Sequence, residues 1–422
     1  MSSRESAYGN IDWLTVLIYG LLVILGWLNI FAVTYDENVT QNIFDFSLNS
    51  GKQLIWILSA IFLIILIMAV DFRFYEAFGY IIYGLIIFSL LLVLFLGREV
   101  AGSNSWFEIG PVRFQPSEFA KFATALAMAK YLGSSTIRME KIKSQLILLA
   151  MMGAPALLII FQGDTGTAMV FSTFLIVLYR EGFSQTFMVL GIFAVVIFVL
   201  TLFIDQVYLI VGVIAIAAII ILFIKRSGRT ILTIAVGVVI IIGVIVSVDY
   251  TINNVLKPHQ QNRVKALINP AADPLGYGWN VTQSKIAIGS GGFNGKGFLN
   301  GTQTKFDFVP EQSTDFIFCT IGEEHGWLGS LILIGLFMTL LLRTVFLAER
   351  QKNRFARVYG YSVVSLLFFH FAVNIGMTIG LFPVIGIPLP FFSYGGSSLW
   401  AFTILLFIFL KLDAHRMQVL TR

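Results

Sequence analysis

The chain has little charge, few histidines and almost no cysteine. Only 12% of its 422 residues are Asp, Glu, Lys or Arg, whereas soluble domains carry roughly a quarter. The single cysteine, Cys319, excludes an internal disulfide, and the 4 histidines argue against a zinc enzyme. The glycine-rich stretch 289–297 lacks the GxxxxGK[ST] order of a phosphate loop. The net charge is +5, but the basic residues are distributed as the expected membrane topology requires, so no nucleic-acid partner is predicted.

Long apolar runs dominate what is present, since 57% of the residues are hydrophobic. Runs of about twenty apolar residues fit helices that cross a ~30 Å hydrocarbon core. We therefore predict an all-α, polytopic membrane helix bundle in which residues 1–422 form a single integral membrane domain. The predicted spans, about twelve, are 11–34, 52–70, 74–96, 117–132, 144–162, 166–180, 185–204, 207–224, 230–249, 316–347, 357–380 and 396–412. The short sixth span and the tight turns around the eighth leave ten or eleven full spans open.

Lys and Arg indicate the orientation. They gather in the segments 138–143, 225–229, 343–357 and 411–422, which alternate correctly if both termini are cytoplasmic. The loops 35–51, 97–116, 250–315 and 381–395 then face outward. The cations of the long loop 250–315 suggest an anionic ligand on that outer face.

Loop 250–315 ends in Phe308-Val-Pro-Glu-Gln-Ser-Thr-Asp-Phe316, so Asp315 falls where the chain re-enters the bilayer. A carboxylate at a lipid boundary is costly unless it is paired or used. One interpretation is a helix cap, worth ~0.5–2 kcal/mol. The other is a carboxylate that takes a proton from a hydroxyl group. The sequence alone leaves both open.

Two charged groups are expected inside spans. Glu118 and Lys121 lie three residues apart, on one helical face, and form either a salt bridge or one wall of a polar cavity that offers Lys121 to a phosphate. Glu323 and Glu324 need partners or a wet cavity, and a buried structural ion pair is slightly favoured over a cavity-lining role.

Other polar residues have simpler explanations. Trp106 is an interfacial anchor by default, or it lines the outward cavity. Asp164 is typical of a turn. His370 and Asn374, four residues apart, are more often interhelical hydrogen-bonders than ligands.

Irregular backbone is predicted in two places. The glycines of 289–297 indicate tight backbone close to another element. The prolines of 383–390, followed by Ser393 and Tyr394, forbid a simple helix. Such backbone is tolerated at membrane depth where it lines a cavity, so Ser393 and Tyr394 are predicted to line the same one.

Four blocks carry a family resemblance. They are Gln115-Pro-Ser-Glu-Phe-Ala-Lys121, Gln283-Ser-Lys-Ile-Ala-Ile-Gly-Ser-Gly-Gly292 with Gly295 and Gly297, Pro310-Glu-Gln-Ser-Thr-Asp-Phe-Ile-Phe318 through Gly322-Glu-Glu324, and Gly386-Ile-Pro-Leu-Pro-Phe-Phe-Ser-Tyr-Gly-Gly-Ser397. The chain resembles the SEDS family (shape, elongation, division and sporulation) of bacterial membrane glycosyltransferases, and more its rod-shape branch than its division branch. It departs from the family in having Ser313 where a His is usual. About two spans are added, between Arg180 and Arg229, to the usual ten.

The resemblance implies polymerisation of lipid II into peptidoglycan glycan strands at the outer face of the bacterial cytoplasmic (inner) membrane during cell elongation. Asp315 matches the family's essential aspartate and would act as the general base on a sugar hydroxyl. The polyprenyl diphosphate leaving group needs positive charge, from Lys121 (paired with Glu118), Arg113, Arg263 and Lys305, or from a divalent cation such as Mg²⁺ or Mn²⁺ whose ligands the sequence does not identify. A class B penicillin-binding transpeptidase is the implied partner.

Two other functions stay open. Broken helices with charges at membrane depth would suit a lipid II flippase, although the sequence shows no inverted repeat of the kind often found in transporters. A non-catalytic scaffold of the wall-synthesis complex would tolerate replacement of Asp315.

Overall fold

The computed structural model describes residues 10–35, 42–100, 102–110, 112–186, 204–223, 227–251, 277–306 and 308–417, with isolated positions between 189 and 261. Contacts divide the chain into two compact units, Met1–Phe183 with Asn280–Arg422, and Ser184–Trp279. The prediction of one domain over 1–422 stays a prediction. Arg263 lies outside the described residues.

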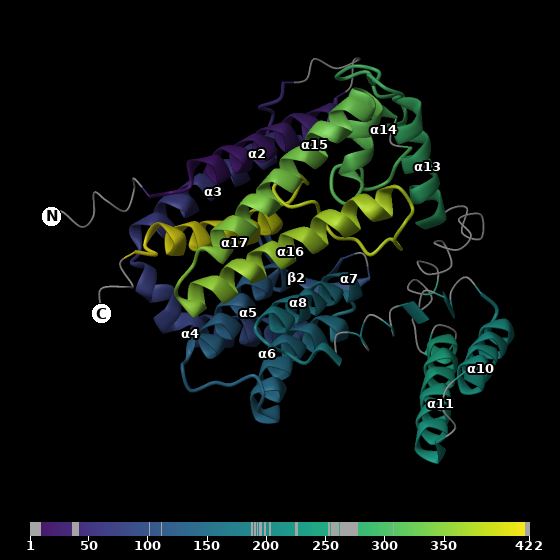
Figure 1. Ribbon diagram of the computed structural model, residues 1–422. Coiled ribbons are helices and arrows are strands. Elements are labelled where there is room, and N and C mark those ends of the chain that lie inside the picture. Colours follow the sequence, from purple (N-terminus) through teal and green to yellow (C-terminus); the bar gives the residue numbers. More distant parts are fainter. Residues whose placement is uncertain are drawn as a thin grey trace. The chain divides into compact units, whose positions relative to one another are not determined.

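The described part is mainly helical (Figure 1). Its elements are α2 (Trp13–Thr34), α3 (Asn49–Ala69), α4 (Phe72–Leu96), β1 (Arg98–Val100), β2 (Ser103–Ile109), β3 (Val112–Phe114), α5 (Pro116–Gly133), α6 (Ile142–Phe161), α7 (Thr165–Val170), η1 (Phe171–Thr173), α8 (Phe174–Arg180), α10 (Gln206–Phe223), α11 (Gly228–Tyr250), α13 (Tyr277–Ser290), α14 (Thr302–Lys305), α15 (Ile317–Glu349), α16 (Arg354–Thr378) and α17 (Gly396–Ala414).

Among the described residues, 9 helices are long and apolar enough to cross a membrane. They are α2, α3, α4, α6, α10, α11, α15, α16 and α17. The predicted spans 117–132 and 166–180 correspond to α5, which carries Glu118, Lys121 and Lys130, and to the short α7–η1–α8 segment. The predicted span 185–204 lies mostly outside the described residues. The helical membrane fold is confirmed, whereas the count of twelve stays a prediction.

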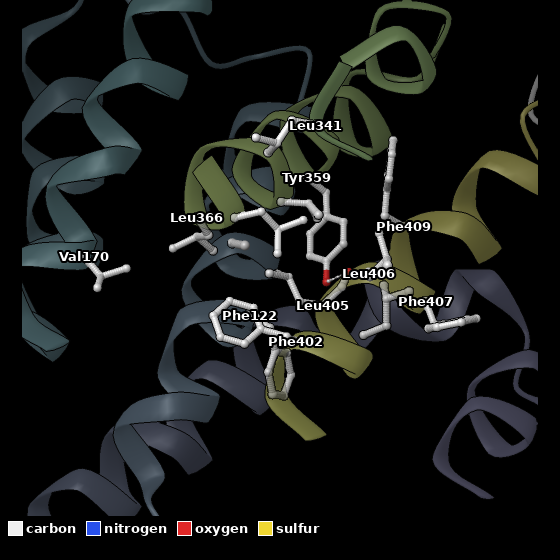
Figure 2. Close-up of a cluster of buried hydrophobic side chains, with 14 of the residues drawn as sticks. Phe122, Val170, Leu341, Tyr359, Leu366, Phe402, Leu405, Leu406, Phe407 and Phe409 are labelled. Atoms are coloured by element: carbon white, nitrogen blue, oxygen red, sulfur yellow. Dashed lines mark hydrogen bonds between the residues drawn. The ribbon is translucent and has the colours of Figure 1, made fainter. Parts of the chain in front are cut away.

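Helix α5 lies at the centre of the first unit and packs against α4, α16 and α17. Small residues along it, such as Ala123 and Ala127, are fully buried and allow these neighbours to approach closely. Figure 2 shows Phe122 of α5 among Leu366 of α16 and Phe402 of α17. The buried Tyr359 hydroxyl in this core donates to the Leu405 carbonyl over 3.1 Å.

Ion pairs fasten one end of the bundle, which we call the Arg350 end. Arg350, where α15 ends, pairs with the fully buried Asp413 of α17. Arg343 pairs with Asp12, which also caps α2. Two arginines at the start of α16, Arg354 and Arg357, both pair with Glu181, the residue after α8. Removing one partner of such a buried pair leaves an uncompensated charge, so these contacts fasten five helix ends, those of α2, α8, α15, α16 and α17.

Segment 97–116, predicted as a loop, is a three-stranded antiparallel sheet in the order β1-β2-β3. Its register pairs Arg98 with Trp106 and Glu108 with Arg113. Gly102 and Gly110, next to the two reversals, have φ of 84° and 62°, which glycine adopts readily. The all-α description is therefore incomplete here. The described part of loop 250–315 likewise contains α13 and α14.

Helix α15 is interrupted at Gly326, where φ is 62° and ψ is −155°. The glycine-rich segment 289–297 fills the interruption, and its backbone thus lies close to another element, as the sequence predicted. Lys296 N and Gly297 N donate to the carbonyls of Glu323 and Glu324, and Trp327 N donates to the Gly292 carbonyl, over 2.9–3.0 Å. The backbone groups freed by the break are thus satisfied by a second segment, the condition for breaking a helix in a membrane.

We expect Gly295→Ala to destabilise the protein. Gly295 has a φ of 80°, and a Cβ there would lie 2.1 Å from the Glu324 carbonyl oxygen. The left-handed backbone alone costs an L-residue about 1–2 kcal/mol, and the clash adds to that. Thermal unfolding of the detergent-solubilised protein measures the loss.

Gly289→Ala is the matched control, because a Cβ at this position of α13 meets nothing within 4 Å. Alanine is the better helix former, so this variant should unfold at or slightly above the parent temperature. Equal midpoints for both variants would contradict the proposed packing of segment 289–297.

Candidate active site

Asp315 lies in a turn that immediately precedes α15, and its side chain is half-buried. The residue that caps α15 is Phe316, which makes no side-chain capping bond. A Cβ on Gly386 would lie 3.3 Å from Asp315 Oδ2, so the carboxylate is seated directly over this glycine. Gly386 has a φ of 72°. A larger residue at 386 would be strained and would crowd the carboxylate.

The irregular segment 381–395 is hydrogen-bonded along the turn that carries Asp315. Ser393 Oγ donates to the Thr314 carbonyl over 2.6 Å, and Tyr394 N donates to the Ser313 carbonyl over 2.9 Å. Ser393 Oγ also accepts from Leu389 N over 2.9 Å. Ser393 is therefore buried and positions backbone, whereas Tyr394 is only half-buried and contributes to the surface of this segment.

Helix α16 contacts both segments through two buried side chains one turn apart. Asn374 Nδ2 donates to the carbonyls of Asp315 and Ile387, each over 2.8 Å. His370 Nδ1 lies 3.1 Å from the Pro388 carbonyl, which can only accept, so Nδ1 carries the proton. The predicted hydrogen-bonding role of both residues is confirmed.

Glu118 and Lys121 form a buried ion pair over 2.7 Å, with side chains 4% and 2% exposed. Lys121 Nζ also lies 3.2 Å from His370 Nε2 and 4.5 Å from the centre of the Phe402 ring. The predicted pairing is confirmed. Because His370 Nδ1 holds the proton, Nε2 accepts from the Lys121 ammonium, which is thereby surrounded by protein.

Asp164, predicted to be a turn residue, caps α7 and connects two motifs. Its carboxylate accepts from Thr167 N over 3.0 Å, Thr167 Oγ1 over 2.8 Å and Gln115 Nε2 over 3.2 Å. Burial raises the pKa of Asp164 above its usual range, although the bonds from Thr167 act in the opposite direction. Gln115 N in turn donates to Ser397 Oγ over 3.2 Å, which ties the first motif to the last.

The structure places three other predicted residues on three separate elements. Arg113 of β3 is 59% exposed and donates to Glu108 over 2.9 Å. Arg98, Arg113 and their hydrogen bonds hold the pKa of Glu108 below its usual range. Trp106 of β2 is half-buried, and Lys305 ends α14, with Nζ 5.5 Å from the centre of the Tyr35 ring.

Glu323 has a structural position. Its side chain is fully buried and accepts from Lys296 Nζ over 2.6 Å and from the backbone N–H groups of Thr302, Gln303 and Thr304 over 2.8–3.0 Å. The carboxylate therefore caps α14 and pairs with a lysine. The favoured interpretation, a buried structural ion pair, is confirmed, because the oxygens of Glu323 accept from protein donors; its cavity-lining role stays a prediction.

The described residues contain no group of three or more His, Cys, Asp or Glu side chains placed to hold a metal ion. The predicted divalent cation therefore stays a prediction, and no chemical step is assigned to one.

Three comparisons identify relatives. A family model for FtsW, RodA and SpoVE, described as "Cell cycle protein", matches residues 12–213 and 179–418. The peptidoglycan glycosyltransferase RodA of Treponema pallidum (strain Nichols) is 33% identical, over 98% of this chain and 100% of the relative. The peptidoglycan glycosyltransferase MrdB of Escherichia coli (strain K12) is 34% identical, over 82% and 80%. The chain belongs to the FtsW/RodA/SpoVE family, which confirms the resemblance drawn from its motifs.

A solved chain from a peptidoglycan synthase complex that coordinates polymerization and crosslinking has the same fold. It superposes with a TM-score of 0.72 at 26% identity, covering 97% of this chain and 99% of that one.

We expect Glu323→Ala to destabilise the first unit strongly. The change leaves the first N–H groups of α14 and the Lys296 ammonium without their acceptor, and loss of one partner of a buried pair typically costs about 3–5 kcal/mol. Thermal unfolding in detergent measures the loss.

Glu349→Ala serves as the control in the same helix, because Glu349 is 51% exposed and pairs with the exposed Arg180. Such a surface change should stay within about 0.5 kcal/mol of the parent protein. If Glu323→Ala unfolded at the same temperature as Glu349→Ala, the anchoring role of Glu323 would have to be abandoned.

Proposed function

We propose that this protein is a peptidoglycan glycosyltransferase that polymerises lipid II into glycan strands, with Asp315 as the general base. The names of the relatives supply the reaction class, and the motif that contains Asp315 supplies the residue. The observation that carries the assignment is the seat of Asp315: a half-buried carboxylate over a glycine, in a turn held by bonds from α16 and from segment 381–395.

The side of the membrane follows from charge. The Arg350 end gathers Arg343, Arg350, Arg354 and Arg357, and the positive-inside rule places such an end in the cytoplasm. Asp315 lies at the opposite end of α15, more than thirty residues away. The carboxylate would then act at the outer face of the bacterial cytoplasmic membrane, with both termini inside.

The proposed step is a direct displacement. The 4-hydroxyl oxygen of the acceptor sugar forms a bond to the anomeric carbon of the donor, while the bond from that carbon to the diphosphate oxygen breaks with inversion. The hydroxyl proton goes to Asp315, and the electron pair leaves with the polyprenyl diphosphate. A positioned base contributes about 10²–10⁴-fold to such a step.

The departing diphosphate requires positive charge nearby. Lys121 is buried and already contacts Glu118 and His370. In this conformation it would stabilise the diphosphate by long-range electrostatic attraction and not by direct contact. Arg113 has an exposed head group and Lys305 a partly exposed one, and these two described cations can make direct contacts with less rearrangement.

A class B penicillin-binding transpeptidase is the proposed partner. The solved relative belongs to a complex in which polymerization and crosslinking are coordinated, and crosslinking is the transpeptidase reaction. Elongation is proposed as the cellular role, because the first relative is a RodA and segment 382–386 favours the rod-shape branch.

Asp315→Ala should abolish polymer formation by the purified protein, supplied with lipid II and its transpeptidase, because the proposed acceptor of the hydroxyl proton is then missing. Gel analysis of labelled glycan strands measures the product. Asp45→Ala is the matched control, since Asp45 is an exposed carboxylate in the predicted outward loop 35–51 and should leave the rate unchanged.

Two results would overturn the proposal. Polymer formation by the Asp315→Ala protein at the parent rate would overturn the assignment of Asp315 as the general base. Transfer of lipid II across reconstituted vesicles without any polymer would instead favour a flippase.

A further inference from the structure

The carboxylate of Asp315 can act only if its turn is held at one place, and the turn has no regular structure of its own. Residues 310–316 form consecutive turns, and Glu311 within them adopts a φ of 55°, an uncommon value for a residue with a side chain. Segment 381–395, on which the turn rests, is also non-helical. Two irregular segments therefore meet at the proposed base. Ser393 and Tyr394 join them directly, and a third, helical element that bonds to both would fix their relative position further.

Asn374 supplies that contact. It lies on α16, is fully buried, and donates one amide hydrogen to the Asp315 carbonyl and the other to the Ile387 carbonyl, each over 2.8 Å. Asp315 bears the carboxylate, and Ile387 directly follows Gly386, on which the carboxylate is seated. The single side-chain amide of Asn374 thus joins the backbone of Asp315 to the backbone of Ile387, the residue after Gly386.

Other contacts place Asn374 within a rigid frame. One turn earlier on α16, His370 bonds the next carbonyl of the same segment, that of Pro388, and reaches the Lys121 ammonium. From α2, Asn29 Nδ2 donates to the Ile317 carbonyl over 3.2 Å. Buried amides from two helices therefore bind the Asp315 turn and the first residue of α15.

We propose that Asn374 is a positioning residue for the glycosyl transfer, which fixes the Asp315 carboxylate relative to Gly386 through its two donated hydrogen bonds. The inference rests on the proposed function of Asp315. Asn374 does not touch the reacting sugars. It acts through the backbone of Asp315 and Ile387, so its loss should lower the rate of the chemical step and leave the binding of lipid II largely intact.

Asn374→Leu tests the inference, because leucine has a similar size and no donor. A displacement of about 1 Å at a reacting group can cost about 10²-fold in rate. We therefore expect kcat to fall about 10²-fold with little change in KM for lipid II, while the complex with the transpeptidase still forms. Initial rates of polymerisation over a range of lipid II concentrations separate the two constants.

Gln351→Met is the matched control. Gln351 is also a buried amide with two donated bonds, to the Leu347 carbonyl over 2.9 Å and to Asp413 over 2.6 Å, but it lies at the Arg350 end. Both substitutions should lower the thermal unfolding midpoint, and only Asn374→Leu should lower kcat. Asn374→Ser, which keeps one donor, gives an intermediate kcat and covers the case in which leucine prevents folding.

The outcomes distinguish this inference from the proposed function. If the parent protein makes polymer, Asp315→Ala does not, and Asn374→Leu keeps the parent kcat, then Asn374 has no positioning role while the general base stands. Equal loss of kcat in Asn374→Leu and Gln351→Met would also overturn the inference, since the effect would then follow stability. If the parent protein makes no polymer, the proposed function itself fails.

Discussion

Unpaired peptide groups are the constraint on which this structure depends. Inside a bilayer each unsatisfied backbone N–H or carbonyl costs several kcal/mol, so a helix can break only where another segment supplies partners. The chain meets this condition twice. Segment 289–297 pairs with the backbone around Gly326, and α16 side chains pair with the carbonyls of Asp315, Ile387 and Pro388. The second set of contacts holds the turn that carries Asp315 in the candidate site.

The two ends of α15 have different chemistry for a physical reason. At the Arg350 end, charged side chains are paired with each other, which fastens helix ends without irregular backbone. At the Asp315 end, neutral amides and hydroxyls bond to backbone carbonyls. Neutral donors therefore hold the backbone of the Asp315 turn.

Sequence reasoning reached the features that are local. The spacing of Glu118 and Lys121 predicts their pairing, Pro116 agrees with the start of α5, and the glycines of 289–297 indicate a close approach. Sequence reasoning did not find the break at Gly326, because the backbone groups that pair with the broken helix lie about thirty residues earlier in the chain. The acceptors of Asn374 are backbone carbonyls, which leave no trace in residue identity. The sheet at 97–116 was also missed, although Gly102 and Gly110 lie next to its reversals.

Cys319 gives the site a built-in reporter. It is the only thiol of the chain, it is fully buried, and its amide donates to the Phe316 carbonyl directly below the Asp315 turn. A maleimide can reach this sulfur only when the packing around the first turn of α15 opens. The labelling rate of the unmodified protein therefore times local opening around the start of α15, without an engineered probe. Comparing the rate with and without the proposed transpeptidase partner would show whether partner binding makes this region more rigid.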